Sequence, residues 1–422
     1  MVIFVNDIRQ IVLDKKIWLY ILAGLIIIDA NSLYIKDYAI GRLIPYLVWG
    51  FSFICVCVVI FRGGIVRSRL VAKALKICVL TGIFLLILYL VKPFNVKINL
   101  QWLLRITTFI FYFIICKDNR LSLLTAYKNI MVVIAIESLF FWLFGSLLGV
   151  VERTGYLYST WAANDNEINV CPSYYGIYFE TQHTNSFDNT GLVRNTAIFT
   201  EAPMASMNFS IALMVECLLK KKPYIPFVIL LCLAILSTVS TTGYMVLLFL
   251  LIFKLMTYHV NTVFWKIIKI IGLPIATLVI IVVGIYVLAD KSDTMSLLLR
   301  VDDFIVGYDT WIESPLFGWG AGNTYPLQQH MDFWRGRETG FSNSVFWVLA
   351  QGGIYLGLPY IVSSIYVFRS MYKLKEYKVL CFMSIYLIML SVTIAPFVNI
   401  TFVVFMSLIM YAQERKIQAR YS

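Results

Sequence analysis

Long apolar runs constrain this chain more than any other feature. A bilayer core of about 30 Å is crossed by roughly 20 apolar residues in a helix, and runs of this kind recur along the whole sequence. Hydrophobic residues make up 60% of the 422 residues and charged residues 14%, against roughly 45–50% and about 25% in soluble domains. We therefore expect an all-α polytopic membrane protein with about 12 transmembrane helices. These spans begin near Ile17, Leu43, Ala74, Asn99, Asn129, Phe199, Tyr224, Thr242, Ile267, Phe341, Tyr377 and Asn399.

The positions of lysine and arginine predict the orientation. Of the 35 basic residues, 24 fall in seven clusters, and every cluster lies on one side of the twelve-span arrangement. Because short loops rich in Lys and Arg stay in the cytoplasm, we expect both termini to be cytoplasmic. The simplest interpretation of each cluster is a retention signal solvated at the headgroups. The net charge of +12 is then mostly topological and does not indicate a nucleic-acid partner.

The same arrangement leaves two long segments on the extracytoplasmic side. We expect helices 1–5 in residues 1–150, a first outer loop at 151–198, helices 6–9 in 199–289, a second outer loop at 290–340, and helices 10–12 in 341–422. The two loops carry a net charge of −7 and most of the polar chemistry. Apolar residues at helical spacing predict an amphipathic helix on the outer surface in the second loop. These residues are Leu298, Val301, Ile305, Tyr308 and Trp311.

The first loop ends in a candidate binding segment. Arg194 and Glu201 are seven residues apart, and two helical turns would place them on one face. Pro203 instead favours a helix that starts about there, which makes Glu201 a first-turn acid stabilised by the helix dipole. The alternative hypothesis is that Arg194 binds an anionic ligand while Glu201 orients that ligand or acts as a base.

The second loop offers further candidates. Arg300 has Asp303 as a possible i,i+3 partner, and a Gly-rich turn around Gly320 would let backbone approach a ligand closely. Arg335 and Arg337 flank a glycine and could present guanidinium groups to phosphate oxygens, or could pair with neighbouring acids at the surface.

Together these arginines predict an anion site at one membrane face. Arg105, six residues into its span, could reach either that face or a central cavity, because an unpaired charge within the bilayer is costly. A ligand with two phosphates, anchored by a lipid tail in the same leaflet, would suit them. Aromatic residues in the loops suit the apolar faces of sugars.

Short ordered motifs resemble the bacterial O-antigen polymerase/ligase family (Wzy/WaaL-type membrane proteins). Residues 194–203 (RNTAIFTEAP) look like the family's Arg–Gly–x–Phe–x–Glu–Pro stretch, and residues 240–244 (STTGY) look like its Ser/Thr-rich turn. Arg300 with residues 315–323 (PLFGWGAGN) is similar to its segment ending in Asn, here Asn323. Residues 342–344 (SNS), centred on Asn343, with 352–357 (GGIYLG) are similar to the start of its later span.

The resemblance implies a glycosyltransferase that acts on glycans linked to undecaprenyl pyrophosphate. It implies that Arg194, Arg300, Arg335, Arg337, Asn323 and Asn343 bind substrate, with Glu201 and His330 as candidate bases. It further implies lipid-linked donor and acceptor oligosaccharides as partners, a chain-length regulator as a possible one, and a multi-pass location in the bacterial inner membrane.

Two departures favour a repeat-unit polymerase of O-antigen, capsule or exopolysaccharide over a ligase. Ligases carry His before the Asn-Ser pair where this chain has Ser342, and they tend to carry Arg in the Ser-rich turn. A ligase and a flippase for lipid-linked oligosaccharides remain the alternatives. No metal-ligand pattern occurs, since the chain has three histidines and no HExxH, so we expect a reaction without metal or other cofactor.

Overall fold

The computed structural model describes residues 15–62, 68–116, 118, 121–161, 168–185, 190–257, 295–335 and 340–421. The span expected near Ile267 and the candidate Arg337 lie outside these residues. Helices dominate the described part, which confirms the expected all-α polytopic membrane class.

The first half of the chain supplies one group of helices. They are α2 (Lys15–Asp29), α3 (Ile44–Arg62), α4 (Ser68–Val91), α5 (Val96–Cys116) and α6 (Ser122–Phe141), with a short 3₁₀ helix at Leu33–Lys36 and a π-helical continuation of α6 at Trp142–Leu147. The second half supplies α7 (Ala202–Met214) with a π-helical end at Val215–Leu219, α8 (Ile225–Ser237), α9 (Thr241–Thr257), α14 (Ser344–Lys373), α15 (Tyr377–Val392), a π-helical turn at Phe397–Thr401 and α16 (Phe402–Tyr421).

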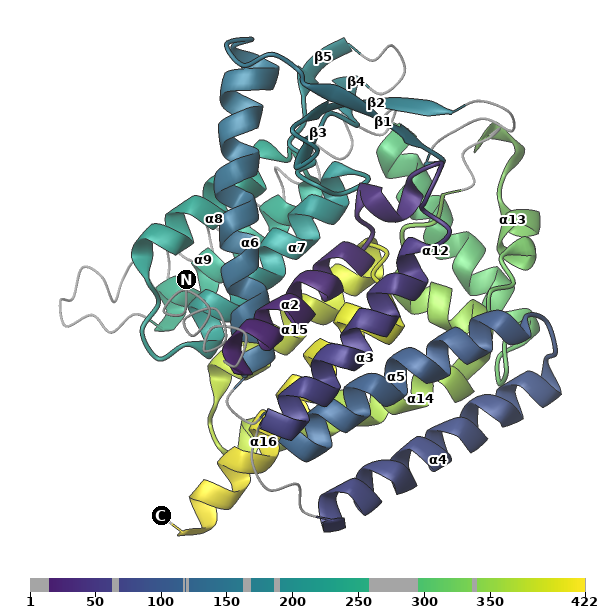
Figure 1. The fold of residues 1–422 in the computed structure, drawn as a ribbon. Coiled ribbons are helices and arrows are strands. Elements are labelled where there is room, and N and C mark those ends of the chain that lie inside the picture. The colour runs from purple at the N-terminus through teal and green to yellow at the C-terminus, as the bar shows by residue number, and fades with distance from the viewer. Residues whose placement is uncertain are drawn as a thin grey trace, which may run out of the picture.

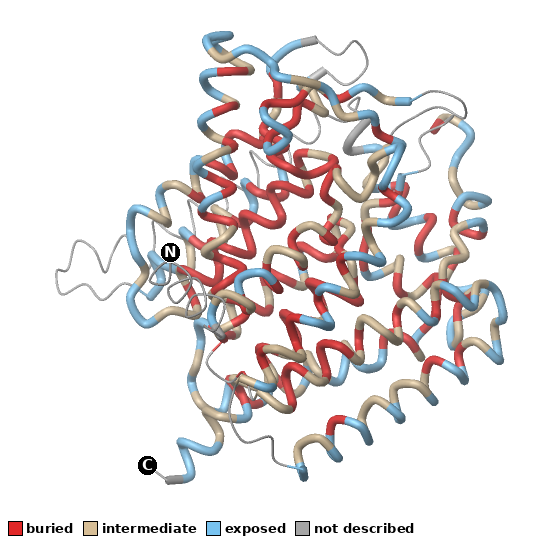
Figure 2. The backbone as a smooth tube through the Cα atoms, viewed as in Figure 1, coloured by how far each residue is buried: buried red, intermediate tan, exposed pale blue. Residues whose placement is uncertain are grey.

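Length and burial of these helices agree with a bilayer environment. Among the described residues, seven helices are long and apolar enough to cross a membrane, and α8, α9 and α15 are shorter apolar helices. Burial differs sharply between these helices. In the helix that starts at Ala202, 83% of the apolar stretch is buried inside the protein, whereas only 17% of the apolar stretch of α4 is buried. An apolar helix that is mostly uncovered by protein, as α4 is in Figure 2, is stable only against lipid.

The segment between α6 and α7 is built from short strands rather than from loop alone. Strands β1 (Gly155–Ser159), β2 (Asn169–Tyr174) and β3 (Tyr178–Phe179) form an antiparallel sheet in that order, and β4 (His183–Asn185) pairs with β5 (Thr190–Val193). A small core of Leu33, Cys171 and Phe179 lies under the first sheet. Alternating burial in β1 and β2 explains the pairing, since one face of the sheet packs inward.

The segment before α14 contains α12 (Met295–Glu313), α13 (Tyr325–His330) and a 3₁₀ turn (Phe333–Arg335). Figure 1 shows α12, α13 and the strands toward the upper part of the view, whereas the start of α2 and the end of α16 lie at the lower left. We call the first of these ends of the bundle the loop end and the second the basic end.

One member of the basic clusters is not solvated, which corrects the interpretation of that residue. Lys128 is fully buried, and its Nζ lies 2.8 Å from Oε2 of the equally buried Glu216. Lys220 also approaches Glu216, at 3.1 Å. Lys128 therefore joins α6 to the end of α7 because its charge is paired.

Candidate functional site

The helix after the first long segment begins at Ala202, with Glu201 as the residue before it in extended backbone (φ −148°) and Pro203 in its first turn. Residues 194–201 are not helical, so the two-turn geometry considered for Arg194 and Glu201 is wrong. The start near Pro203 is confirmed, because the proline needs no N–H partner in the first turn.

Arg194 lies across the turn that connects α8 and α9. Its Nε donates to the carbonyl of Thr238 at 3.0 Å and its Nη2 to that of Val239 at 3.2 Å. The next residue, Asn195, is fully buried and donates from Nδ2 to the hydroxyl of Ser237 at 2.9 Å. The turn between the end of α8 at Ser237 and the start of α9 at Thr241 is therefore the surface on which the segment that carries Arg194 packs.

Three predicted site residues from two distant segments come together at the loop end. Burial lowers the pKa of Arg194, the charge of Glu201 raises it, and the charge of Arg300 lowers it further. Burial also lowers the pKa of Arg300, and Glu201 and Asp303 raise it. Because such effects weaken with distance, Glu201 lies within electrostatic range of two partly buried guanidinium groups.

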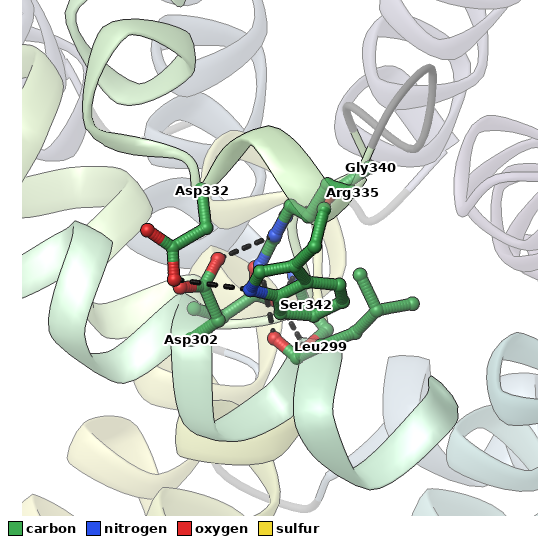
Figure 3. Close-up of polar contacts among 8 residues, drawn as sticks. Leu299, Asp302, Asp332, Arg335, Gly340 and Ser342 are labelled. Atoms are coloured by element: carbon green, nitrogen blue, oxygen red, sulfur yellow. Dashed lines mark hydrogen bonds and ion pairs between the residues drawn. The ribbon is translucent and has the colours of Figure 1, made fainter. Parts of the chain in front are cut away.

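Arg335 has a different environment, shown in Figure 3. Its guanidinium lies 2.5 Å from Oδ2 of Asp302 and 2.5 Å from Oδ1 of Asp303, and all three side chains are buried. It also donates to the carbonyls of Leu299 (3.0 Å) and Gly340 (3.1 Å). Arg335 thus ties α12 to the start of α14.

Ser342 shares the Asp303 carboxylate with Arg335. Its backbone N–H donates to Oδ2 at 2.7 Å and its hydroxyl donates at 2.6 Å. Asp303 was expected as the i,i+3 partner of Arg300, but its oxygens accept from Arg335 and Ser342, and its charge acts on Arg300 in addition. Sequence reasoning missed this role of Asp302 and Asp303, because their partner is more than 30 residues away.

We call Arg194, Arg300 and Glu201 the arginine group, and His330 lies apart from it. Its Nε2 is 3.2 Å from Oε2 of Glu313, the last residue of α12. Thirteen residues of helix separate Glu313 from Arg300, which is about 20 Å at 1.5 Å per residue. The structure therefore does not bring His330 to Glu201.

The Gly-rich turn approaches backbone of its own chain. Gly318 has φ +60°, and a Cβ there would lie 2.5 Å from the backbone N of Gly352. Gly353, inside α14, has φ +61°, and its Cβ would lie 2.3 Å from the carbonyl carbon of Leu316. Backbone hydrogen bonds join the two segments, for example from Trp319 to the carbonyl of Ala350 at 2.8 Å. The glycines are needed for this contact.

The two predicted asparagines stabilise the ends of this unit. Asn323 donates from Nδ2 to the Trp319 carbonyl at 3.1 Å. Asn343 is the N-cap of α14, and its Oδ1 accepts from the N–H of Phe346 at 3.0 Å, as N-cap residues typically do. Whether either side chain also contacts substrate stays a prediction.

The apolar stripe of α12 faces away from the rest of the described structure. Leu298, Val301, Ile305 and Tyr308 are exposed, while Asp302, Asp303 and Val306 are buried. Gly307 lets α12 approach Phe346 closely. The helix therefore places Arg300 by packing its polar face on α14.

Residues 226–361 match the model of the family described as O-antigen ligase. No curated protein matches the chain. The matched range includes Arg300, Arg335 and Asn343, and it confirms the resemblance to Wzy/WaaL-type proteins. Enzymes of this family act on lipid-linked glycans in the membrane, so the match supports a membrane glycan-processing function in O-antigen or polysaccharide assembly.

Proposed function

From the O-antigen ligase domain at residues 226–361, we propose that this protein is a polysaccharide polymerase. It would transfer a growing glycan from undecaprenyl pyrophosphate onto a lipid-linked repeat unit on the extracytoplasmic side of the bacterial inner membrane. The observation that supports the proposal is that the charges of Glu201 and Arg300 both act on Arg194, and that the charge of Glu201 also acts on Arg300. Two like charges held together in a partly buried place are costly, and an anionic ligand between them offsets that cost.

The reaction needs charge neutralisation more than a strong acid. An acceptor hydroxyl oxygen attacks the anomeric carbon of the donor glycan, and the bond from that carbon to pyrophosphate oxygen breaks. The electron pair leaves with the pyrophosphate, whose developing charge Arg194 and Arg300 stabilise. The acceptor proton passes to a carboxylate base. Direct attack inverts the anomeric centre.

Glu201 is the base candidate that shares the arginine group. It precedes the first residue of α7, and its charge acts on both guanidinium groups. His330 contacts Glu313 at the far end of α12. A base must come within hydrogen-bond reach of the proton that it accepts, so we assign the role to Glu201.

In this proposal Arg335 positions Arg300 and does not itself contact the substrate. With Asp302 and Asp303 it fixes the helix that carries Arg300. Asn323 and Asn343 maintain the turn and the N-terminus of α14 on which that helix packs. Arg337 is retained as a candidate for phosphate binding on sequence grounds.

A ligase that transfers finished glycan to a different acceptor is the second candidate, favoured by the description of the matched family. Against it stands Ser342, whose hydroxyl donates to Asp303 where ligases carry His. The two reactions use the same donor, so only the acceptor distinguishes them.

The test mixes purified full-length protein with a synthetic lipid-linked repeat unit and separates products by size. A ladder of chain lengths supports the polymerase, and Arg194→Lys and Arg300→Lys should each remove most long chains, because lysine cannot replace a bidentate guanidinium. Lys221→Gln, exposed at the basic end, is the matched control and should leave the ladder unchanged.

Full activity of both lysine variants would contradict the arginine clamp. Absence of any ladder from wild-type protein, with transfer of finished glycan to another lipid acceptor, would establish the ligase instead. Cysteine labelling that places residues 295–335 in the cytoplasm would overturn the proposal as a whole.

A further inference from the structure

A second set of cationic and polar side chains, distinct from Arg194 and Arg300, lies at the loop end of α5. Lys97, Gln101 and Arg105 are spaced at i, i+4 and i+8, which places them on one face of the helix. Lys97 is exposed, whereas Gln101 and Arg105 are partly buried. The face therefore runs from the surface of the molecule toward its interior over about two turns.

Tyr46 of α3 completes this face. Its hydroxyl accepts from Nε2 of Gln101 at 2.9 Å, and Nζ of Lys97 lies 5.5 Å from the centre of its ring. The charges of Lys97 and Arg105 both act on this phenol. Its hydroxyl proton is therefore available to an acceptor in a positive environment.

The inner end of the face is fixed by a buried network. Nη2 of Arg105 lies 2.9 Å from Oδ1 of Asp29, whose other oxygen accepts from Nδ2 of Asn399 at 2.8 Å. The face and its network thus hold the positive charges of Lys97 and Arg105 and the negative charge of Asp29. Arg105 is held in place, and the charge of Lys97 is the surplus.

The placement of Lys97 is unfavourable unless an anion binds there. It is the second residue of α5, where the positive end of the helix dipole disfavours a cation. The first turn holds no acidic residue that would offset this effect. Lys and Arg are also depleted in short external loops of membrane proteins. A lysine, an arginine and a phenol hydroxyl together suit phosphate oxygens.

This face lies next to the arginine group and not within it. The N–H of Thr200, which precedes Glu201, donates to the carbonyl of Asn31 at 3.1 Å. Asn31 follows the end of α2, where Asp29 pairs with Arg105. Exposed Leu47 and Leu100 flank the face on α3 and α5, so an anion bound here can keep an isoprenoid tail in the lipid.

We propose that Lys97, Gln101, Arg105 and Tyr46 bind the pyrophosphate of the lipid-linked acceptor, the second substrate. This rests on the proposed polymerase function. The donor pyrophosphate is the leaving group and requires Arg194 and Arg300, whereas the acceptor pyrophosphate undergoes no bond change and needs only to be held. Two lipid anions in one leaflet repel each other, so each requires its own cationic site.

The test separates the two substrates chemically. A donor whose non-reducing hydroxyl is blocked can only give its glycan. An acceptor whose anomeric carbon is bonded directly to the phosphorus of its lipid-linked pyrophosphate analogue, as a phosphonate, has no bond to a leaving oxygen and can only receive a glycan. With full-length Lys97→Glu, we expect KM for the acceptor to rise at least about fivefold, which corresponds to about 1 kcal/mol for a basic residue near the surface. KM for the blocked donor should stay unchanged. Tyr46→Phe should raise the acceptor KM less, and Lys221→Gln should change neither constant.

An unchanged acceptor KM in Lys97→Glu would overturn this inference while the polymerase proposal stood. An equal rise in both KM values would also overturn it, because the face would then act on the donor or on the membrane surface in general. Competition by phosphatidylglycerol vesicles as strong as that by the phosphonate acceptor would assign the face to ordinary anionic lipid instead. If wild-type protein joins no blocked donor to the acceptor, the proposed function itself fails.

Discussion

Replacement of Arg335 by methionine tests whether this residue anchors α12 or binds substrate. The change leaves the carboxylates of Asp302 and Asp303 buried without their cation, since these side chains are only 8% and 3% exposed. Removal of one partner from a buried ion pair costs about 3–5 kcal/mol. The cost should appear as a weaker docking of α12 on α14.

Hydrogen exchange of the backbone amides of Met295–Glu313 measures this docking, because exchange of a local unit reports its opening free energy. A loss of about 3–5 kcal/mol should speed exchange by about a hundred-fold to several thousand-fold. Polymer synthesis should fall in parallel, because Arg300 is carried by the same helix. Neutralising both acids in the same chain (Asp302→Asn, Asp303→Asn) should restore part of the protection.

Arg415→Met is the matched control. Arg415 pairs with Glu376 at 3.2 Å, but the two side chains are 34% and 28% exposed, and such surface pairs contribute about 0–1 kcal/mol. Exchange in α16 should change by no more than about fivefold. The reasoning is refuted if Arg335→Met abolishes polymer while α12 exchanges as slowly as in wild type, since Arg335 would then contact substrate.

Two further predictions concern backbone and thiol chemistry. Gly353→Ala should lower the thermal midpoint of unfolding, because φ +61°, ψ −161° is a conformation for glycine alone and the added Cβ would meet Leu316. Gly50→Ala in α3, where the added Cβ meets open space, is the control and should be neutral or stabilising. An equal loss of thermal midpoint in both variants would contradict the contact between Gly353 and Leu316. Burial raises the pKa of Cys171 to about 11, so its thiolate is scarce at pH 8 and alkylation by iodoacetamide, followed by mass spectrometry of its peptide, should be slow until the protein is denatured or the pH approaches 11. Rapid labelling of native protein at pH 8 would show that this thiol is accessible.

The membrane class and most helix positions followed from the sequence. Each apolar run of suitable length predicts a helix by itself, because a bilayer admits backbone only when its hydrogen bonds are satisfied within the segment. Pro203 located the start of α7, and the polar run after Ser237 located the turn between α8 and α9. These are local properties, and they did not require knowledge of neighbouring helices.

The partners of each charged residue were decided by tertiary structure. Four of the five arginines predicted for one ligand are described, and they have different environments. The charge of Glu201 acts on Arg194 and Arg300, Arg335 is bound between two aspartates, and Arg105 pairs with Asp29. Apart from Arg194 and Glu201, which are close in the chain, these contacts join segments that are dozens of residues apart. Composition shows that a costly buried charge must find a partner, but only the packing of helices determines which partner lies within reach.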